Sequence, residues 1–357
     1  MKNRIFLFPF FTGLMVLILD LVPVKCEGQA TQFVNDSINV FYDSLFYHLR
    51  HSYLLKDEVN WDSLEQNIRN KALERQHFEK SLQVTTELFD AIKGSHMNLF
   101  SEKGWYKSTL MPEIPQSEFN IKFLEKYAEN PSFETRVLDD SYGYVLMPGM
   151  LLIDVSQDSI NKVAQNMYDQ IIEMHKSNSL KGWIIDLRFN IGGNVFPMLS
   201  SLYHLLGNTV TYTVKNRNGQ LKEEYLLQNG NIKDEESGGA SVQPKTPPNQ
   251  NIPVALIVGR LTASAGELIP LSFRVRQNVL VVGEKSYGLL TANTLTELPF
   301  STKLTLTSGY LADRSGTYTE RIVPDIEVIK EANFEDLLKD QNVIEAIKFI
   351  KSKNESN

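Results

Sequence analysis

The stretch KGWIIDLRFNIGGN, residues 181–194, decides how the rest of this chain folds. Its apolar run at residues 182–187 ends in charge, which is typical of a buried strand. The adjacent Gly192 and Gly193 can adopt positive φ and let the backbone approach another group. The pattern at residues 195–206 then predicts a helix with one apolar face. Backbone N–H groups at such a turn fit either an oxyanion or anion site or a purely structural turn.

The bulk composition indicates an ordinary globular protein of about two domains, because 42% of its 357 residues are hydrophobic and 22% are charged. The net charge is −7, and no basic stripe with interleaved aromatic residues occurs, so nucleic acid is not an expected partner. The single cysteine, Cys26, excludes an internal disulfide. No His/Cys/Asp group has metal-ligand spacing, and the glycines of residues 188–193 form no phosphate loop. We therefore expect neither a metal nor a nucleotide cofactor.

Residues 1–26 have the pattern of an export signal, because a positive start precedes an almost wholly apolar run at residues 5–22. The run is long for a cleaved signal, so an uncleaved membrane anchor is a second interpretation. Cys26 follows the run as a lipid-modified cysteine would, but Lys25 is a poor fit to the small residue that such a site prefers. We expect an exported protein, periplasmic, cell-envelope or secreted, with membrane association if this segment is retained.

Helical spacing of apolar residues dominates residues 31–100 and predicts three helices. One of them starts near Asn60, with Asp62 as N-cap and Glu65 three residues later. A mixed connection with a short helix at residues 123–128 follows. We therefore expect an N-terminal helical bundle at residues 30–135.

Strands alternate with helices from residue 136 onward, which predicts an α/β (α+β) layer architecture. We expect this domain to span residues 136–335, followed by a C-terminal helix and tail at residues 336–357. Glycine, serine and proline at residues 230–251 indicate an exposed loop. The remaining expected strands are 142–148, 149–154, 253–258, 279–283, 304–310 and 322–328, with a hairpin at 209–227. The remaining expected helices are 159–177, one that follows residues 259–267 and ends near 276, and 334–351.

Ser264 is a candidate nucleophile, because it lies among small residues just past a buried strand and at the first turn of a helix. The same position also suits a simple helix cap, which the local pattern favours. A serine nucleophile needs a base. Of the six histidines, His96 differs in following Gly94 and Ser95 at a helix exit, although a histidine there is also a common C-terminal charge.

Four segments occur in the order seen in the tail-specific (C-terminal processing) serine proteases, which this chain resembles. The resemblance covers most of residues 142–328 and implies a crotonase- or Clp-protease-like peptidase domain. The four segments are GWIIDLRFNIGG at 182–193, TASAGE at 262–267, GEKSYG at 283–288 and VPDIEV at 323–328.

This family has two catalytic designs, and the chain is similar to the one that pairs serine with histidine. In the serine–lysine design the lysine follows the glycine that corresponds to Gly288, but here Leu289 stands there. Lys285 is three residues too early. Similarity to the other, tricorn-core-like branch implies Ser264 as nucleophile and His96 as general base.

The resemblance implies three further roles. Ser95 would orient or polarise His96, and Glu320 would be the fourth catalytic residue. Glu320 is displaced from the family position, which falls near Tyr318, and a solvated strand-edge carboxylate is an equal interpretation. The oxyanion hole would consist of the N–H groups of Gly192 or Gly193 together with Ala265, in agreement with the geometry expected from the glycine turn.

The leading interpretation is an exported serine peptidase that hydrolyses peptides or unfolded proteins through a Ser264/His96 acyl-enzyme. A second is a non-catalytic binding protein for an apolar ligand on the same fold, as in the interphotoreceptor retinoid-binding protein. A third, a crotonase-like acyl-CoA enzyme, is disfavoured by export and by the missing nucleotide signature.

The span between His96 and Tyr142 is too short for a PDZ-type module of about 90 residues. Many tail-specific proteases use such a module to bind the C-terminal carboxylate of a substrate, so its absence from this span weakens the expectation that this protein recognises substrate C-termini. The sequence specifies neither the substrate nor the oligomeric state.

Overall fold

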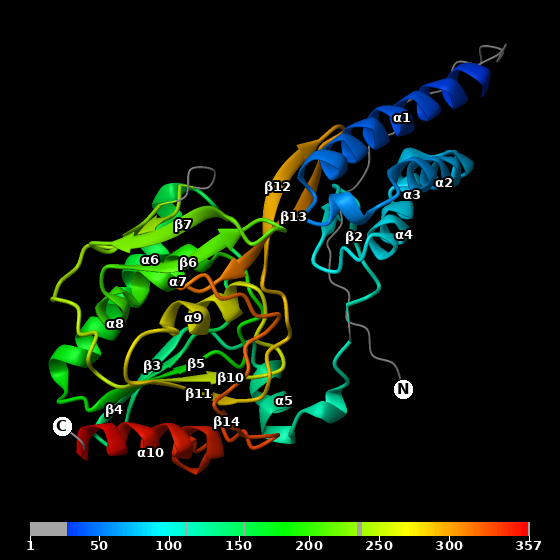
Figure 1. The fold of residues 1–357 in the computed structure, drawn as a ribbon. Helices are drawn as coiled ribbons and strands as arrows, with labels where there is room; N and C mark the ends of the chain where they lie inside the picture. Colours follow the sequence, from blue (N-terminus) through cyan, green and yellow to red (C-terminus); the bar gives the residue numbers. More distant parts are fainter. Residues whose placement is uncertain (1–26, 112, 153, 234–237, 356–357) are drawn as a thin grey trace, which may run out of the picture.

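The computed structural model describes residues 27–111, 113–152, 154–233 and 238–355, drawn as a ribbon in Figure 1. It is a mixed α/β structure with an N-terminal helical segment, which confirms the predicted fold class. Residues 1–26, on which the export prediction depends, lie outside the described residues. Within the described ranges, no helix is long and apolar enough to cross a membrane.

A six-stranded sheet forms the centre of the fold, and all its neighbouring strands are parallel except the first two in the chain. Its central strands are buried at every position, as a parallel sheet covered on both faces requires. In spatial order the strands are β14 (Ile326–Glu327), β11 (Val279–Gly283), β10 (Val254–Val258), β5 (Gly182–Asp186), β4 (Tyr142–Leu146) and β3 (Glu134–Leu138).

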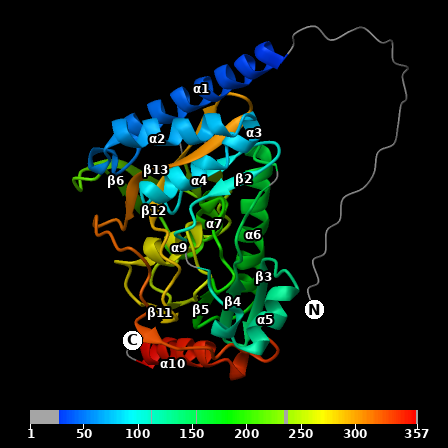
Figure 2. The same ribbon diagram turned by 90° about the vertical axis from the view of Figure 1, so that its right-hand side faces the viewer.

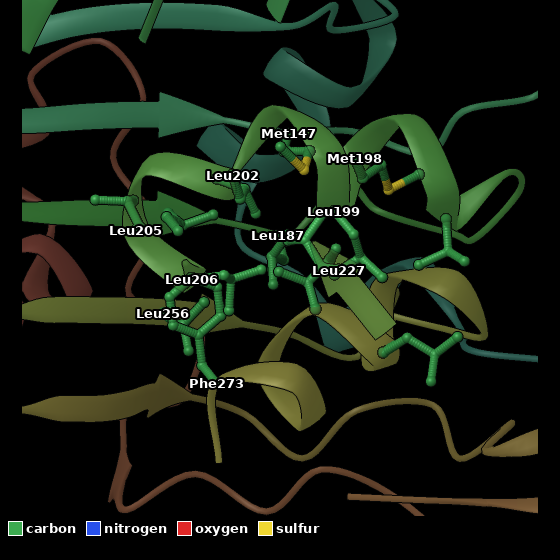
Figure 3. Packing of buried hydrophobic residues seen from close by; sticks show 14 of the residues in the cluster. Met147, Leu187, Met198, Leu199, Leu202, Leu205, Leu206, Leu227, Leu256 and Phe273 are labelled. Atoms are coloured by element: carbon green, nitrogen blue, oxygen red, sulfur yellow. The ribbon is translucent and has the colours of Figure 1, made fainter. Parts of the chain in front are cut away.

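Alternate side chains of this sheet enter two different hydrophobic clusters, because successive residues of a strand point to opposite faces. Trp183 and Ile185 pack with α6 (Gln157–Ser177), α7 (Val195–Ser201), α8 (Tyr203–Leu206) and α9 (Ala265–Phe273). Figure 3 shows part of this cluster, with Leu187 among leucines of α7 and α8. Ile184 faces the other cluster, which contains α5 (Ile121–Ala128) and α10 (Gln341–Glu355).

A second sheet connects this body to the helical segment, and its hairpin of β12 (Thr291–Leu298) and β13 (Thr302–Ala312) extends between the two (Figure 1). The other strands, in spatial order from the β13 side outward, are β1 (Asn98–Phe100) and β2 (Trp105–Lys107) on one side, and β6 (Thr209–Lys215), β7 (Leu221–Gln228), β8 (Asn231–Ile232) and β9 (Ala240–Ser241) on the other.

The helical segment lies at one end of the molecule and α10 at the opposite end (Figure 1, Figure 2). Leu298, Leu304 and Leu306 of the hairpin are buried in the same hydrophobic cluster as these helices, so the hairpin forms part of their core. The segment comprises α1 (Glu27–Ser52), α2 (Trp61–Glu74), α3 (Phe78–Ser81) and α4 (Val84–Ala91); the short 3₁₀ helices of the chain are Lys56–Glu58, Gln116–Glu118 and Leu337–Lys339.

Three local predictions were wrong. The strand expected at 149–154 is absent from its described part, where Met150 makes only an isolated bridge to Gly193 and no neighbouring strand extends the pairing. The N-cap of α2 is Asn60 rather than Asp62, because the helix begins with the buried Trp61. The segment 230–251 is not simply an exposed loop, since β8 and β9 pair within it and its apolar side chains are partly buried.

A buried ion network anchors the end of β5 to α10. Arg188 is 4% exposed, and Asp186 and Asp340 are fully buried. Arg188 Nη2 lies 2.6 Å from Asp186, and its Nη1 lies 2.8 Å from Asp340 Oδ2. Burial alone would raise the pKa of Asp340, but the Arg188 guanidinium and backbone hydrogen bonds hold that pKa below its ordinary value. The network therefore fixes the segment that immediately precedes the glycine turn.

We expect Asp340→Ala to lower the free energy of unfolding by about 3–5 kcal/mol, because it leaves the Arg188 charge buried and only partly compensated. Urea unfolding followed by circular dichroism measures this loss. The control on the same helix is Lys348→Ala, which removes an exposed pair with Glu345 and should cost no more than about 1 kcal/mol. Equal losses for the two variants would contradict the role given to the network.

Candidate active site

Ser264 occupies a strained position between β10 and α9. It has φ 53° and ψ −118°, and positive φ is uncommon for a residue with a Cβ. Hydrogen bonds of the two preceding residues help to hold it there: Ala263 N–H donates to the carbonyl of Asn190 over 2.9 Å, and Thr262 Oγ1 donates to the carbonyl of Leu187 over 2.9 Å. The side chain is half-buried. A serine raised on a strained turn at a helix N-terminus is suited to nucleophilic attack.

The glycine turn lies directly against Ser264. A Cβ added to Gly192 would lie 3.0 Å from the Ser264 Cβ and 3.2 Å from the carbonyl oxygen of Ala263, at φ +108°. Glycine is therefore required here for close approach as well as for the backbone conformation. The segments that follow the neighbouring parallel strands β5 and β10 therefore meet at the carboxyl edge of the sheet.

The two glycines differ in what their N–H groups do. Gly192 is buried, and its N–H donates to Asn190 Oδ1 over 3.1 Å. Gly193 is exposed, and within the described part of the chain neither its N–H nor that of Ala265 takes part in a hydrogen bond. Ala265 is the first residue of α9, where N–H groups have no partner inside the helix. Ala265 follows Ser264 in the chain, and Gly193 follows the glycine that contacts it, so both leave a backbone donor near Ser264 for a bound anion or oxyanion.

Glu267 fastens the following loop to Ser264. Its buried carboxylate accepts the Ser264 N–H at 2.9 Å and the Leu289 N–H at 2.7 Å through Oε2. Through Oε1 it accepts the Ser286 hydroxyl at 2.5 Å and the Gly288 N–H at 3.0 Å. Burial raises the pKa of Glu267, and these hydrogen bonds oppose that effect. The carboxylate therefore fixes residues 286–289, the segment that contains Leu289, through structural hydrogen bonds.

His96 follows α4 and contacts the hairpin. Its Nδ1 lies 2.7 Å from Thr291 Oγ1, and its carbonyl accepts the Asn293 side-chain amide at 2.9 Å. Burial lowers the pKa of His96 to about 4, an effect that a main-chain hydrogen bond with Thr291 partly opposes. The imidazole is therefore neutral at neutral pH, as a general base must be.

His96 and Ser264 share no hydrogen bond among the described residues, but a chain of bonded neighbours joins them. Thr291, which contacts His96, is two residues from Leu289, a span of about 7 Å along an extended chain. Leu289 binds Glu267, and Glu267 binds the Ser264 N–H. Catalytic hydrogen bonds are often long or unformed before substrate binds. The structure connects the two residues through these neighbours without joining them directly, and their meeting at one catalytic site stays a prediction.

The other two predicted residues do not contact the His96 ring through any hydrogen bond of the described residues. Ser95 is half-buried beside it in the chain, and Glu320 is exposed. Glu320 lies within electrostatic reach of Tyr318, whose pKa burial raises to about 12, with contributions from Tyr310, Glu320 and Glu267. Tyr318 packs on Tyr310 with ring centroids 4.5 Å apart. The structure gives Glu320 no contact with His96 among the described residues, so its role as fourth catalytic residue stays a prediction.

Comparison with known proteins identifies the family to which this chain belongs. The sequence pattern of peptidase family S41 matches residues 141–328. This chain belongs to the S41 peptidase family. A relative, the nisin-resistance protein of Lactococcus lactis subsp. lactis, is 34% identical over 186 residues, which cover 50% of this chain and 56% of that protein. The matched region thus spans little more than half the length of that relative.

Two solved structures share the fold over nearly the whole chain. A lipoprotein from Streptococcus agalactiae has a TM-score of 0.63 at 22% identity and covers 94% of this chain and 100% of its own. A protein described as a candidate peptidase, from Parabacteroides merdae, has a TM-score of 0.59 at 18% identity and covers 90% of this chain and 99% of its own. Both likenesses extend over far more of the chain than residues 141–328, which match the family pattern.

Sequence reasoning missed two residues of this site. A sequence pattern could have indicated Glu267, since Ser264 and Glu267 have the spacing of a capping box. Its contacts to residues 286–289 depend on a loop that returns from β11, and no local pattern shows that. No sequence pattern indicates the contact of Thr291 with His96, because the two residues are 195 positions apart in the chain. Within the described ranges, no group of three or more His, Cys, Asp or Glu side chains is arranged to hold a metal ion.

Proposed function

We propose that this S41 family member is an exported serine peptidase that hydrolyses peptides or unfolded proteins through an acyl-enzyme on Ser264. The observation that carries the proposal is the strained Ser264 at the N-terminus of α9, together with the N–H groups of Gly193 and Ala265, which have no hydrogen-bond partner among the described residues. A structural helix cap requires neither the strain nor two free donors. An acyl-transfer site requires a reachable hydroxyl and oxyanion donors.

The chemistry follows from these groups. As Ser264 Oγ attacks the scissile carbonyl carbon, His96 Nε2 takes the hydroxyl proton, and the Gly193 and Ala265 N–H groups hold the carbonyl oxygen as it becomes negative. The C–N bond then breaks, and His96 returns the proton to the leaving amine. Water, deprotonated by His96, attacks the ester carbonyl and releases the acid and free Ser264. The step requires His96 and Ser264 to approach one another when substrate binds.

The direct test is covalent labelling combined with turnover. Purified protein should cleave unfolded casein, and a fluorophosphonate probe should modify Ser264, as identified by peptide mass spectrometry. Nisin is a second test substrate, because the related Lactococcus protein is named for resistance to it. A folded sample that cleaves no substrate and takes up no label would refute the proposal.

The missing hydrogen bond between His96 and Ser264 favours one alternative, a non-catalytic binding protein for an apolar ligand. Saturable binding of a fluorescent fatty acid without turnover, unchanged in Ser264→Ala, would support this alternative.

The proposal that the protein is exported depends on the sequence pattern of residues 1–26. Sequencing the N-terminus of the protein recovered from outside the cytoplasm would distinguish a cleaved signal from a retained anchor or a lipid-modified Cys26.

The pH profile should reflect the lowered pKa of His96. Because burial holds that pKa near 4, the base stays neutral and active well below pH 6.5, and the acid limb of kcat/KM should lie near pH 4. Between pH 6.5 and 4 the unfolded chain binds a proton at this position and the folded chain does not, so stability from His96 is lost as pH falls. Initial rates measured on the acid side test this. An acid limb near 6.5 would contradict the burial of the ring.

A further inference from the structure

The hairpin connects the two parts of the molecule that supply the two reactive groups. Its tip, with Leu298 and Leu304, is buried in the core of the helical segment, which carries His96. Its base pairs with β6 in the body, where Ala312 lies opposite Thr213. The hairpin is therefore placed to set the position of the histidine relative to the serine.

Two residues of β12 hold His96 from different sides. Thr291 contacts the ring through its hydroxyl, and Asn293 donates to the main-chain carbonyl. Asn293 is itself fixed, since its Oδ1 accepts the Thr307 hydroxyl at 2.9 Å. A β-bulge lies between the two contacts, where the pairing of β12 with β13 shifts after Ala292 and leaves one extra residue, Ser308, on β13. Bulges bend a strand and redirect side chains near functional sites.

We propose that Thr291 is the positioning residue of His96 and fixes the tautomer in which Nδ1 carries the proton and Nε2 is free to accept the proton of Ser264. This rests on the proposed function. In a neutral imidazole one nitrogen donates and the other accepts, and the partner of one nitrogen decides the role of the other. The hydroxyl oxygen of Thr291 lies 2.7 Å from Nδ1 and can accept the proton of this nitrogen.

This assignment gives Thr291 the role that the resemblance assigned to Ser95 and Glu320. A threonine hydroxyl is uncharged, so it orients the imidazole without providing a counter-ion for the imidazolium that forms during attack. The low pKa of the free ring is consistent with a neutral partner, because a carboxylate at Nδ1 would raise it.

The test compares two substitutions at one position. Thr291→Val keeps the shape and the main-chain carbonyl but removes the hydroxyl, and it should lower kcat about tenfold, equivalent to one neutral hydrogen bond, with KM unchanged. Thr291→Ser restores the hydroxyl and should recover most of the activity. The control is Thr294→Val on the same strand, whose hydroxyl contacts Ser308 and not His96, and it should leave kcat unchanged.

A readout independent of turnover separates this inference from the proposed function. In full-length protein with ¹⁵N-labelled histidine, the His96 signal, assigned by its loss in His96→Gln, should show a protonated Nδ1. In Thr291→Val the Nε2-protonated form should appear. If wild type is active and Thr291→Val matches it in kcat, the inference fails and the peptidase stands. If wild type cleaves nothing, the proposed function fails, and an unchanged tautomer in Thr291→Val would overturn the inference as well.

Discussion

Replacing Ser264 with alanine should lower kcat by about 10⁴-fold or more, because no acyl-enzyme can form without the hydroxyl. The backbone should keep its conformation, since alanine tolerates this φ about as well as serine does and keeps the main-chain N–H and carbonyl of residue 264, which both bind Glu267. Binding of a peptide substrate, measured by fluorescence anisotropy, should be retained. Loss of turnover with retained binding assigns the hydroxyl to chemistry rather than to recognition.

The matched control for Ser264→Ala lies on the same helix. Ser272 is buried, and its hydroxyl donates to the Leu268 carbonyl at 2.7 Å, within α9. Ser272→Ala removes a serine hydroxyl without touching the glycine turn, so kcat should stay within a few-fold of wild type. Turnover is read with a quenched fluorescent peptide, and folding with circular dichroism. Undiminished cleavage by Ser264→Ala would place the nucleophile elsewhere and leave Ser264 as a helix cap.

The parts of this site that the sequence predicts are those whose physical cause is local. Residues 182–186 form a buried strand because apolar residues dominate this run, and the paired glycines must form a turn because few other residues adopt their φ. Ser264 follows from small neighbours at a strand–helix junction. These features meet in space because the carboxyl ends of parallel strands β5 and β10 share one edge, and the order of the elements already implies a parallel sheet.

The parts that the sequence does not predict depend on distant contacts. The residues of β12, TANTLTEL, show no clean alternation of apolar and polar residues, since most of them are only half-buried. The pairing with β13 creates this strand, and the hairpin then brings Thr291 to His96. The strand wrongly expected at 149–154 shows the converse, because an apolar pattern there finds no neighbour except Gly193. In each case the tertiary partner, not the local pattern, determines the structure.

Replacing His96 with alanine should lower kcat by about a hundredfold or more, within the range lost when a general base is removed. The serine hydroxyl would then have to lose its proton to water. Exposed His77, in the same helical segment, is the matched control, and His77→Ala should leave kcat unchanged. The measurement is the initial rate at pH 7 for each variant, with unfolding curves to show that the helical segment remains folded.

The double variant His96→Ala/Ser264→Ala decides whether the two residues act as one unit. If His96 serves only to activate Ser264, the double variant should be no slower than Ser264→Ala alone, because removing the base from a site without its nucleophile costs nothing further. Multiplied losses would instead mean that His96 contributes through another route, such as substrate binding. The free structure, in which Thr291 holds the ring and no hydrogen bond joins it to Ser264 among the described residues, makes this cycle informative. Non-additivity would show that His96 acts through Ser264 in the reaction.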